Sequence, residues 1–367
     1  VIPVCWNRES DPEKSEAEMP KEGNKLKEHD ADSKCIRHRP WHQYRQKSMN
    51  LEERHNHKEK NMIAIRNREQ VIAVGNYAYE MHERTPSNIE VITPMSNGRI
   101  ANVLMVEAVL HTLLHRCTRH MGYRPELYFS VPCDMTEIER RSYYTIAHKG
   151  ALKNCRMYLV DKPIADALAL GIPINRTKGS MIVNIGAQST EISVIANARV
   201  IFSRIIPVGG KQFNESICNL NRRKNNFQIG SKTAKRVKIA LADLGTDKKE
   251  ARKVRGVDGA SGLPMEGIIT SSLVNEALLS GVNEIGEEIK HALERTPPQI
   301  HDHIQKEGIY ITGGSTRIPN IDRYLSRQLG CPVQLSQYYD LCTICGLKEL
   351  ITHDALHRWA YTVNKKK

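Results

Sequence analysis

From residue 61 onwards, short apolar runs of strand type alternate with longer segments of helix type. The helix pattern is clearest at 101–121, where valines and leucines recur every three or four positions. Apolar runs typical of strands lie at residues 61–65, 70–74, 126–132 and 155–160. This alternation predicts an α/β fold, in which helices flank a central sheet.

The second half of the chain continues the pattern. A meander of strands is predicted over 179–210 because β-branched residues dominate it. Two helices, a two-strand excursion over 254–270 and a long amphipathic helix follow. A strand and a small-residue turn come at 308–319, before a closing helix near 344–352. Each half therefore contains a strand, a small-residue turn and later helices, which suggests two related lobes.

Residues 1–60 differ in composition from this remainder. They carry 13 basic and 12 acidic residues but only eight Val, Ile, Leu, Met or Phe, which is too few to build a core. The whole chain has 367 residues and a net charge of +13, most of it beyond residue 60. That length is typical of two or three domains.

Several classes of protein are disfavoured. No run approaches the ~20 apolar residues that a membrane-spanning helix needs. Nine cysteines without a framework indicate reduced thiols in a cytoplasm, and Cys342 and Cys345 are interpreted as core thiols. No basic block with interleaved aromatic residues is present, so nucleic acid is not an expected partner.

Two turns have the composition of phosphate-binding loops. Residues 184–191 and 311–318 each place small residues after an apolar strand, where backbone N–H groups can approach an anion. Either turn alone is more typical of a plain hairpin or a helix cap. A basic helix between them places Lys235 and Lys238 within one turn of each other, although a solvated helix face explains that spacing equally well.

These segments resemble the bacterial actin family of MreB. The likeness covers about residues 61–350 and rests on motifs in the family's order. They read TEIERRS, KPIADALALGIP, GSMIVNIGAQSTEISVI, IIPVGGKQFNESI, IGSKTAKRVKIAL, SGLPMEGIIT, ERTPPQIHDHI and GIYITGGSTRIPNID. The resemblance implies the actin/Hsp70/sugar-kinase fold, with two lobes and ATP with Mg²⁺ between them.

The resemblance also implies a domain plan and a function. Lobe I is expected at 61–177 with helices of 335–360 returning to it, and lobe II at 178–334, followed by a basic tail at 361–367. The implied function is an ATP-responsive cytoskeletal filament that directs cell-wall synthesis and rod shape, with at most weak ATPase activity. The implied partners are further copies of the chain, the cell-wall elongation machinery and the inner membrane surface. The implied location is the cytoplasm, peripheral to that membrane.

The resemblance assigns roles to individual residues. Glu139 matches the glutamate that orients or activates the attacking water, and Asn184 stands at a Mg²⁺-serving position. The second phosphate loop matches Gly186, Ala187, Gln188, Ser189 and Thr190, with Ser189 placed near the γ-phosphate. Ribose and adenine contacts match Lys235, Arg236 and Lys238, and the adenosine-side turn matches Gly313, Gly314, Ser315 and Thr316. A capping role for Glu139 with Thr136 is compatible with the catalytic one.

The chain departs from the family pattern D-I-G-G-G-T-T-E at this loop. Asn184 replaces an aspartate, and Ala187 and Gln188 replace glycines, so side chains intrude where backbone would meet phosphate. Lys211 also stands where the family usually has aspartate. Slow or absent hydrolysis is therefore expected.

The family's first strand, with its G-I-D-L-G-T phosphate loop, has no counterpart before residue 61. Codons permitted for 34–47 yield that string when read one base later, which favours a shifted reading frame over a divergent tail; sequencing the DNA of the first sixty codons tests this. Either origin predicts a poorly packed 1–60 segment and an exposed sheet edge in lobe I.

Two other functions stay open. One is a non-hydrolysing scaffold that keeps the filament surface, which Asn184 and Gln188 favour. The other is a small-molecule kinase of the same superfamily, which would need a substrate-binding acid that the sequence does not place.

Overall fold

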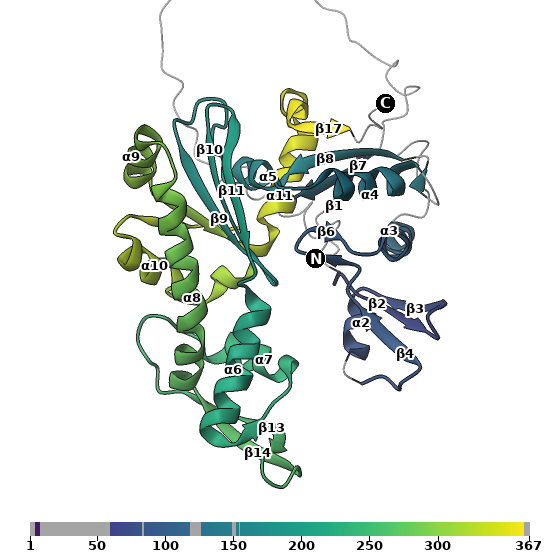
Figure 1. Ribbon diagram of the computed structural model, residues 1–367, viewed down its shortest axis with the longest axis vertical. Helices are drawn as coiled ribbons and strands as arrows, with labels where there is room; N and C mark the ends of the chain where they lie inside the picture. The colour runs from purple at the N-terminus through teal and green to yellow at the C-terminus, as the bar shows by residue number, and fades with distance from the viewer. Residues whose placement is uncertain are drawn as a thin grey trace, which may run out of the picture.

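The computed structural model describes residues 4–7, 59–82, 84–117, 126–148, 152–153 and 155–362. These residues form two lobes, each with a mixed sheet, and helices α5 (Lys162–Ala169) and α11 (Cys342–Thr352) lie between the two sheets (Figure 1). The α/β fold with two lobes, expected from the sequence, is confirmed. The segment 34–47, to which the frame-shift hypothesis applies, lies outside the described residues.

Lobe I is built on a sheet with the order β1-β7-β8-β17. Its strands are β1 (Val4–Asn7), β7 (Glu126–Val131), β8 (Arg156–Asp161) and β17 (Ala360–Thr362). The two central strands are parallel, and an antiparallel strand lies on each side of them. Apolar side chains of β7 pack with those of helices α3 (Val103–Cys117) and α4 (Glu137–His148).

The sequence predicted an exposed edge for this sheet, and for the described residues that prediction is wrong. Strand β1 pairs antiparallel with β7, in a register that places Val4 opposite Phe129 and Asn7 opposite Glu126. Backbone groups along an open strand edge seek hydrogen-bond partners, and any extended segment can supply them. Four residues of the core-poor segment therefore close the edge of lobe I.

A smaller unit lies next to the main sheet and helices of lobe I (Figure 1). It contains a sheet of order β3-β2-β4 and a short helix, followed by a two-stranded hairpin. The elements are β2 (Ile63–Arg66), β3 (Gln70–Val74), α2 (Asn76–Met81), β4 (Ile89–Ile92), β5 (Met95–Ser96) and β6 (Arg99–Ile100). The antiparallel pairing of β2 with β3 confirms the hairpin predicted from the two apolar runs.

Lobe II is built on a sheet with the order β11-β10-β9-β15-β16. The antiparallel strands β9, β10 and β11 confirm the predicted meander, and β15 is parallel to both β9 and β16. The strands are β9 (Ser180–Ile185), β10 (Thr190–Ala196), β11 (Arg199–Ile206), β15 (Ile309–Thr312) and β16 (Val333–Leu335).

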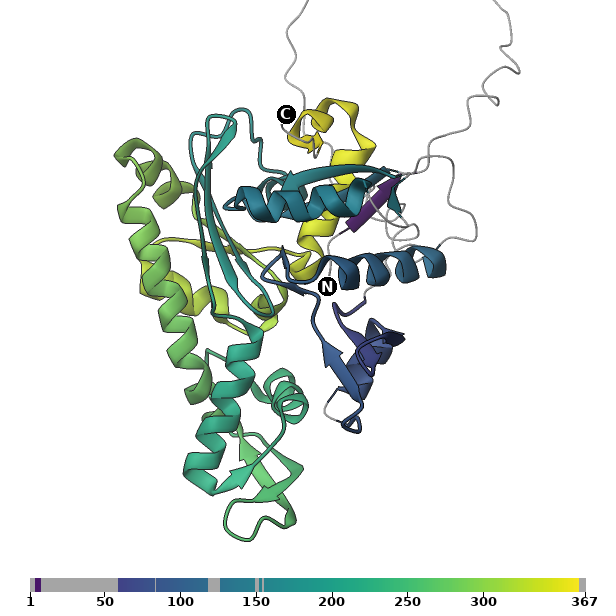
Figure 2. The ribbon, with the colours of Figure 1, turned by 45° about the vertical axis from the view of Figure 1, so that its right-hand side comes forward.

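Helices pack on this sheet and extend beyond it (Figure 2). The long helix α8 carries buried apolar residues along much of its length and shares one core with the sheet. The helices are α6 (Gly210–Asn225), α7 (Ser231–Leu241), α8 (Ser271–Glu294), α9 (Pro298–Glu307) and α10 (Ile321–Leu329). A small sheet of order β12-β13-β14 comprises β12 (Phe227–Gln228), β13 (Ala251–Asp258) and β14 (Pro264–Thr270). Short 3₁₀ helices are η3 (Gly314–Arg317), η4 (Tyr339–Leu341) and η5 (Asp354–Trp359).

Helices α5 and α11 join the lobes by close packing. They belong to an apolar core that also takes residues from β8 of lobe I and from β9 and β10 of lobe II. At the crossing, Gly346 of α11 faces the backbone of Ala165, and a Cβ at position 346 would overlap the Ala165 carbonyl group. A side chain at this glycine would therefore force the two helices apart. Among the described helices, none is long and apolar enough to cross a bilayer.

We expect Gly346→Ala to lower the free energy of unfolding by about 1–3 kcal/mol, because the added methyl group would overlap backbone that cannot rotate away. Urea unfolding followed by circular dichroism measures the change. The matched control is Gly286→Ala in α8, where the three atoms nearest to the added one belong to the side-chain amide of Gln328. Helix propensity favours that control substitution by up to about 1 kcal/mol. Equal stability of both variants would contradict the close crossing.

Candidate functional site

The first small-residue turn lies at the tip of the β9–β10 hairpin. Its backbone closes through the Gly186 N–H group, which donates to the Ser189 carbonyl oxygen at 2.9 Å. A Cβ at Gly186 would stand 2.9 Å from that same oxygen, so the tight turn requires glycine there. Where the hairpin opens into this turn, Asn184 lies directly opposite Glu191.

The second turn meets the first because β15 runs parallel to β9. Carboxyl ends of parallel strands lie at the same edge of a sheet, where ligands bind in open α/β folds. Gly313 adopts a φ of +98° and packs against the backbone of Ile185. The Ser315 hydroxyl donates to the Gly186 carbonyl oxygen at 2.9 Å. The structure thus brings both turns, 186–190 and 313–316, together.

The start of helix α6 completes the cluster. The Gly210 N–H group donates to the Gly186 carbonyl oxygen at 3.0 Å, and the Lys211 N–H group donates to that of Ala187 at 2.7 Å. The Lys211 side chain points to Glu215 instead, at 3.9 Å. The amino end of α6 therefore abuts the first turn, with the positive end of its dipole nearest to it.

Of the predicted basic residues, Lys238 reaches this cluster. Its Nζ donates to the Gly210 carbonyl oxygen at 2.8 Å. Lys235 lies close enough to repel it, but its ammonium sits over the Tyr79 ring, 5.7 Å from the centroid. Arg236 is exposed and donates to Thr233 at 3.4 Å. Burial, and then repulsion from Lys235, lowers the pKa of Lys238 to about 8.

Glu139 lies in lobe I at the start of α4, in contacts that do not involve the turns. It accepts hydrogen bonds from the Thr136 N–H group at 2.6 Å and from the Thr136 hydroxyl at 2.9 Å, while the Glu139 N–H group donates back to that hydroxyl. Its other oxygen pairs with Arg99 at 3.1 Å. The capping box is thus confirmed, and the catalytic role of Glu139 stays a prediction.

Gln188 crosses from lobe II to lobe I. Its Oε1 accepts a hydrogen bond from the Asn97 N–H group at 3.2 Å. Asn97 and Gly98 form the turn between β5 and β6, both with positive φ. The residue that replaces a family glycine therefore spans the space between the first turn and lobe I.

A buried polar network lies beneath the first turn. Asn184 Nδ2 donates to Asp166 Oδ2 at 2.7 Å, and the Thr343 hydroxyl donates to Asp166 Oδ1 at 2.6 Å. One helical turn before Asp166, Lys162 Nζ pairs with Glu191 Oε2 at 3.2 Å. The network links α5, α11 and the β9–β10 hairpin, and thus both lobes.

The charges in this network perturb one another. Burial raises the pKa values of Asp166 and Glu191, and the neighbouring Lys162 partly opposes that effect. Burial alone would lower the pKa of Lys162, but Glu191 and Asp166 together raise it, so the amine stays charged. Sequence reasoning missed these contacts, although Lys162 and Asp166, two charged residues in the otherwise apolar segment 162–170, were a usable signal.

The residues present do not fit a divalent cation beside Asn184. The amide of Asn184 donates to Asp166, so it faces that carboxylate as a hydrogen-bond donor. An ammonium, that of Lys162, already pairs with Glu191 across the hairpin from Asn184. No group of three or more His, Cys, Asp or Glu residues in the described part of the chain is arranged to hold a metal. The prediction of Mg²⁺ at Asn184 thus gains no support from the donor set.

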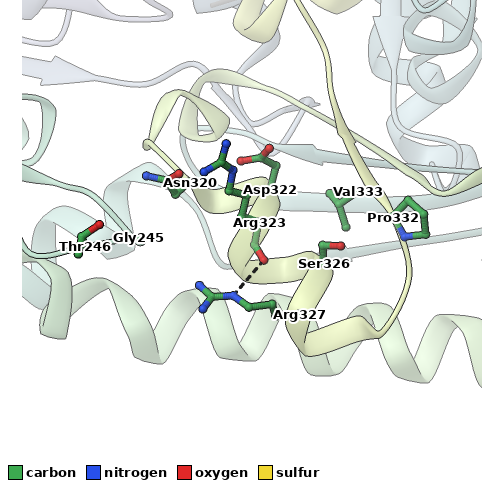
Figure 3. Close-up of a pocket in the computed structure, with 9 residues that line it drawn as sticks. All are labelled: Gly245, Thr246, Asn320, Asp322, Arg323, Ser326, Arg327, Pro332 and Val333. Atoms are coloured by element: carbon green, nitrogen blue, oxygen red, sulfur yellow. Dashed lines mark hydrogen bonds between the residues drawn. The ribbon is translucent and has the colours of Figure 1, made fainter.

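A cavity of about 710 Å³ lies elsewhere in lobe II (Figure 3). It is bounded by α10, by the segment after α7 and by residues at the start of β16. None of the predicted site residues lines it. The lining residues are Gly245, Thr246, Asn320, Asp322, Arg323, Ser326, Arg327, Pro332 and Val333.

Comparison with known proteins places this chain in a family. The family model described as MreB/Mbl protein matches residues 56–358. This chain belongs to the MreB/Mbl family. It is 34% identical to the cell shape-determining protein MreB of Escherichia coli K12 over 280 residues, 75% of this chain and 80% of that protein. It is 32% identical to the cell shape-determining protein Mbl of Bacillus subtilis 168 over 291 residues, 78% of this chain and 87% of that protein.

Solved structures of similar proteins agree with the fold. MreB5 of Spiroplasma citri bound to ADP is 28% identical with a TM-score of 0.76, covering 82% of this chain and 90% of that one. Its AMPPNP-bound form has a TM-score of 0.75. The MamK double helical filament, at 17% identity and a TM-score of 0.66, shares the fold over 80% of this chain and 92% of that one. The predicted family and actin-like fold are therefore confirmed.

We expect the stability contribution of Lys238 to depend on pH between about 8 and 10.5. Its pKa is lower in the folded state than the ordinary 10.5, so the folded protein loses this proton first and gains stability as pH rises through that window. Lys238→Met should be more stable than the wild type at pH 7 by about 1–3 kcal/mol, with the advantage shrinking towards pH 10.5. Urea unfolding of both proteins at several pH values measures this. A stability difference that is constant with pH would contradict the lowered pKa.

Proposed function

We propose that this chain is a nucleotide-binding, filament-forming actin homologue that determines cell shape. The observation that carries the proposal is the convergence of the first turn, the second turn, the start of α6 and Lys238 at one sheet edge of lobe II. Ser315 and Gly210 both bond the Gly186 carbonyl group, and Lys238 bonds that of Gly210. Such a set of backbone amides, hydroxyls and one cation suits an anionic ligand.

The phosphates of the nucleotide would lie at residues 186–190, in front of the amino end of α6. The Gly210 and Lys211 N–H groups already donate to the first turn, so α6 would act on the anion through the positive end of its dipole. Lys238 would add a full positive charge at pH 7, since its pKa is about 8. The nucleoside would lie towards the turn at 313–316, with Lys235 and Arg236 on the same side.

Relatives supply the biological role. MreB5 binds ADP and AMPPNP, MamK forms a double helical filament, and the Escherichia coli relative determines cell shape. We extend nucleotide binding, self-assembly and shape determination to this chain. In the same proposal the filament acts in the cytoplasm at the inner face of the membrane and directs the cell-wall elongation machinery. The proposal does not include Mg²⁺ beside Asn184. The Asn184 amide faces Asp166, and the nearby Lys162 already supplies a cation.

A second candidate is the non-hydrolysing scaffold, and Gln188 favours it. Its amide already bonds Asn97 of lobe I, so the two lobes are bridged without a nucleotide. The catalytic role of Glu139 is also unsupported by any contact with the turns, since its carboxylate caps α4 and pairs with Arg99. Both observations support slow hydrolysis in either candidate.

Sedimentation of the full chain with and without ATP separates the two candidates. ATP-dependent pelleting with phosphate release close to background is expected for the proposed filament. Pelleting that ignores nucleotide would instead assign the scaffold role. A chain that stays monomeric under all conditions would overturn both, and phosphate release at an ordinary steady-state rate would overturn the expectation of slow hydrolysis.

We expect Gln188→Gly to strengthen nucleotide binding by about fivefold. A phosphate at the first turn would have to displace the Gln188–Asn97 hydrogen bond, whose net contribution is ~1 kcal/mol. Titration with a fluorescent ADP analogue measures the dissociation constant. Gln228→Ala, at an exposed position in β12, serves as the control and should leave the constant unchanged. Unchanged or weaker binding by Gln188→Gly would show that this amide does not obstruct the site.

A further inference from the structure

Beneath the first turn, two residues of lobe II face two residues of lobe I. Asn184 and Glu191 are opposite each other where the β9–β10 hairpin opens into the turn. Lys162 and Asp166, one helical turn apart on α5, bond to Glu191 and Asn184 respectively. One ammonium and two carboxylates are thus gathered below the proposed phosphate position.

Lys162 has the most exposed side chain of the three charged residues in this group. The side chain of Glu191 is only 5% exposed, and Asp166 is 1% exposed. The Lys162 side chain keeps 25% of its surface exposed. A ligand at the turn can therefore approach Lys162 without first displacing the buried carboxylates.

A charged amine at this place has an electrostatic consequence. Phosphate oxygens need a nearby positive charge when they leave water, and a metal ion or a fixed cation can provide it. Lys162 is held by Glu191 and lies at the start of α5, whose first turn contains no other charged residue. A divalent cation in the same space would be repelled by this ammonium.

We propose that Lys162 is a built-in cation that replaces the divalent metal, so that this chain binds nucleoside phosphates without Mg²⁺. The inference rests on the proposed nucleotide site at residues 186–190. It adds that a side chain of the protein, and not a metal ion, supplies the positive charge that the phosphates need. Lys162 acts here as a binding residue, and no step of hydrolysis is assigned to it.

The test is the dissociation constant of a fluorescent ADP analogue for the full chain, measured in EDTA and in MgCl₂. Equal constants within about threefold are expected for the wild type. Lys162→Met should bind at least tenfold more weakly in EDTA, which corresponds to about 1.4 kcal/mol of binding free energy. Lys162→Arg keeps the positive charge and should keep metal-free binding. Lys224→Met, in an exposed pair with Glu276 far along α6, is the control and should match the wild type.

Each result of these binding measurements either supports or overturns the inference about Lys162. Wild-type binding that needs Mg²⁺ would overturn the inference and leave the proposed nucleotide site standing. No binding under either condition would overturn the nucleotide site, and the inference with it. Circular dichroism checks that each variant is folded. If Lys162→Met unfolds, the comparison of the wild type with Lys162→Arg decides, because loss of metal-free binding with a cation retained would refute the charge argument.

Discussion

Asp166 joins the two lobes because its two carboxylate oxygens are each bonded by a different element. A buried carboxylate is costly unless its lone pairs are satisfied, and here Asn184 of β9 and Thr343 of α11 satisfy them. The same contact explains a departure from the family pattern. An aspartate at position 184 would place a second carboxylate against Asp166, whereas asparagine offers an N–H donor. Asn184 is therefore matched to Asp166 rather than simply lost as a metal ligand.

The candidate site depends on this arrangement. With β9 and β10 tied to α5, the hairpin tip has a defined position relative to lobe I, and Gln188 reaches Asn97. The parallel pairing of β9 with β15 then places the second turn against the first, and Ser315 bonds Gly186. The close crossing of α5 and α11 also fixes this arrangement, because Gly346 allows the backbones of the two helices to come close. The site is thus a consequence of how strands and helices pack between lobes.

Much of this could be predicted from the sequence because the signals were local. The meander of β9–β11 and the β2–β3 hairpin follow from runs of β-branched residues between turn residues, and the capping box of α4 follows from the spacing of Thr136 and Glu139. Strand β1 gave no such signal. Its pairing with β7 is made by backbone groups, which any extended segment possesses. The catalytic role of Glu139 stays a prediction, since residue identity at one position does not say which partner a side chain will meet.

The sequence by itself determined the family, the two-lobed α/β fold and the two small-residue turns, since these depend on periodicity and on residue types at fixed spacings. Only the tertiary structure decided which charges share the space beneath the first turn. A helix of one lobe carries Lys162 and Asp166, and a hairpin of the other carries Asn184 and Glu191. Their pairing depends on distances that no local sequence pattern encodes. The Coulomb energy of two charges depends on the distance between them, and packing sets those distances, so packing decided the chemistry of this site.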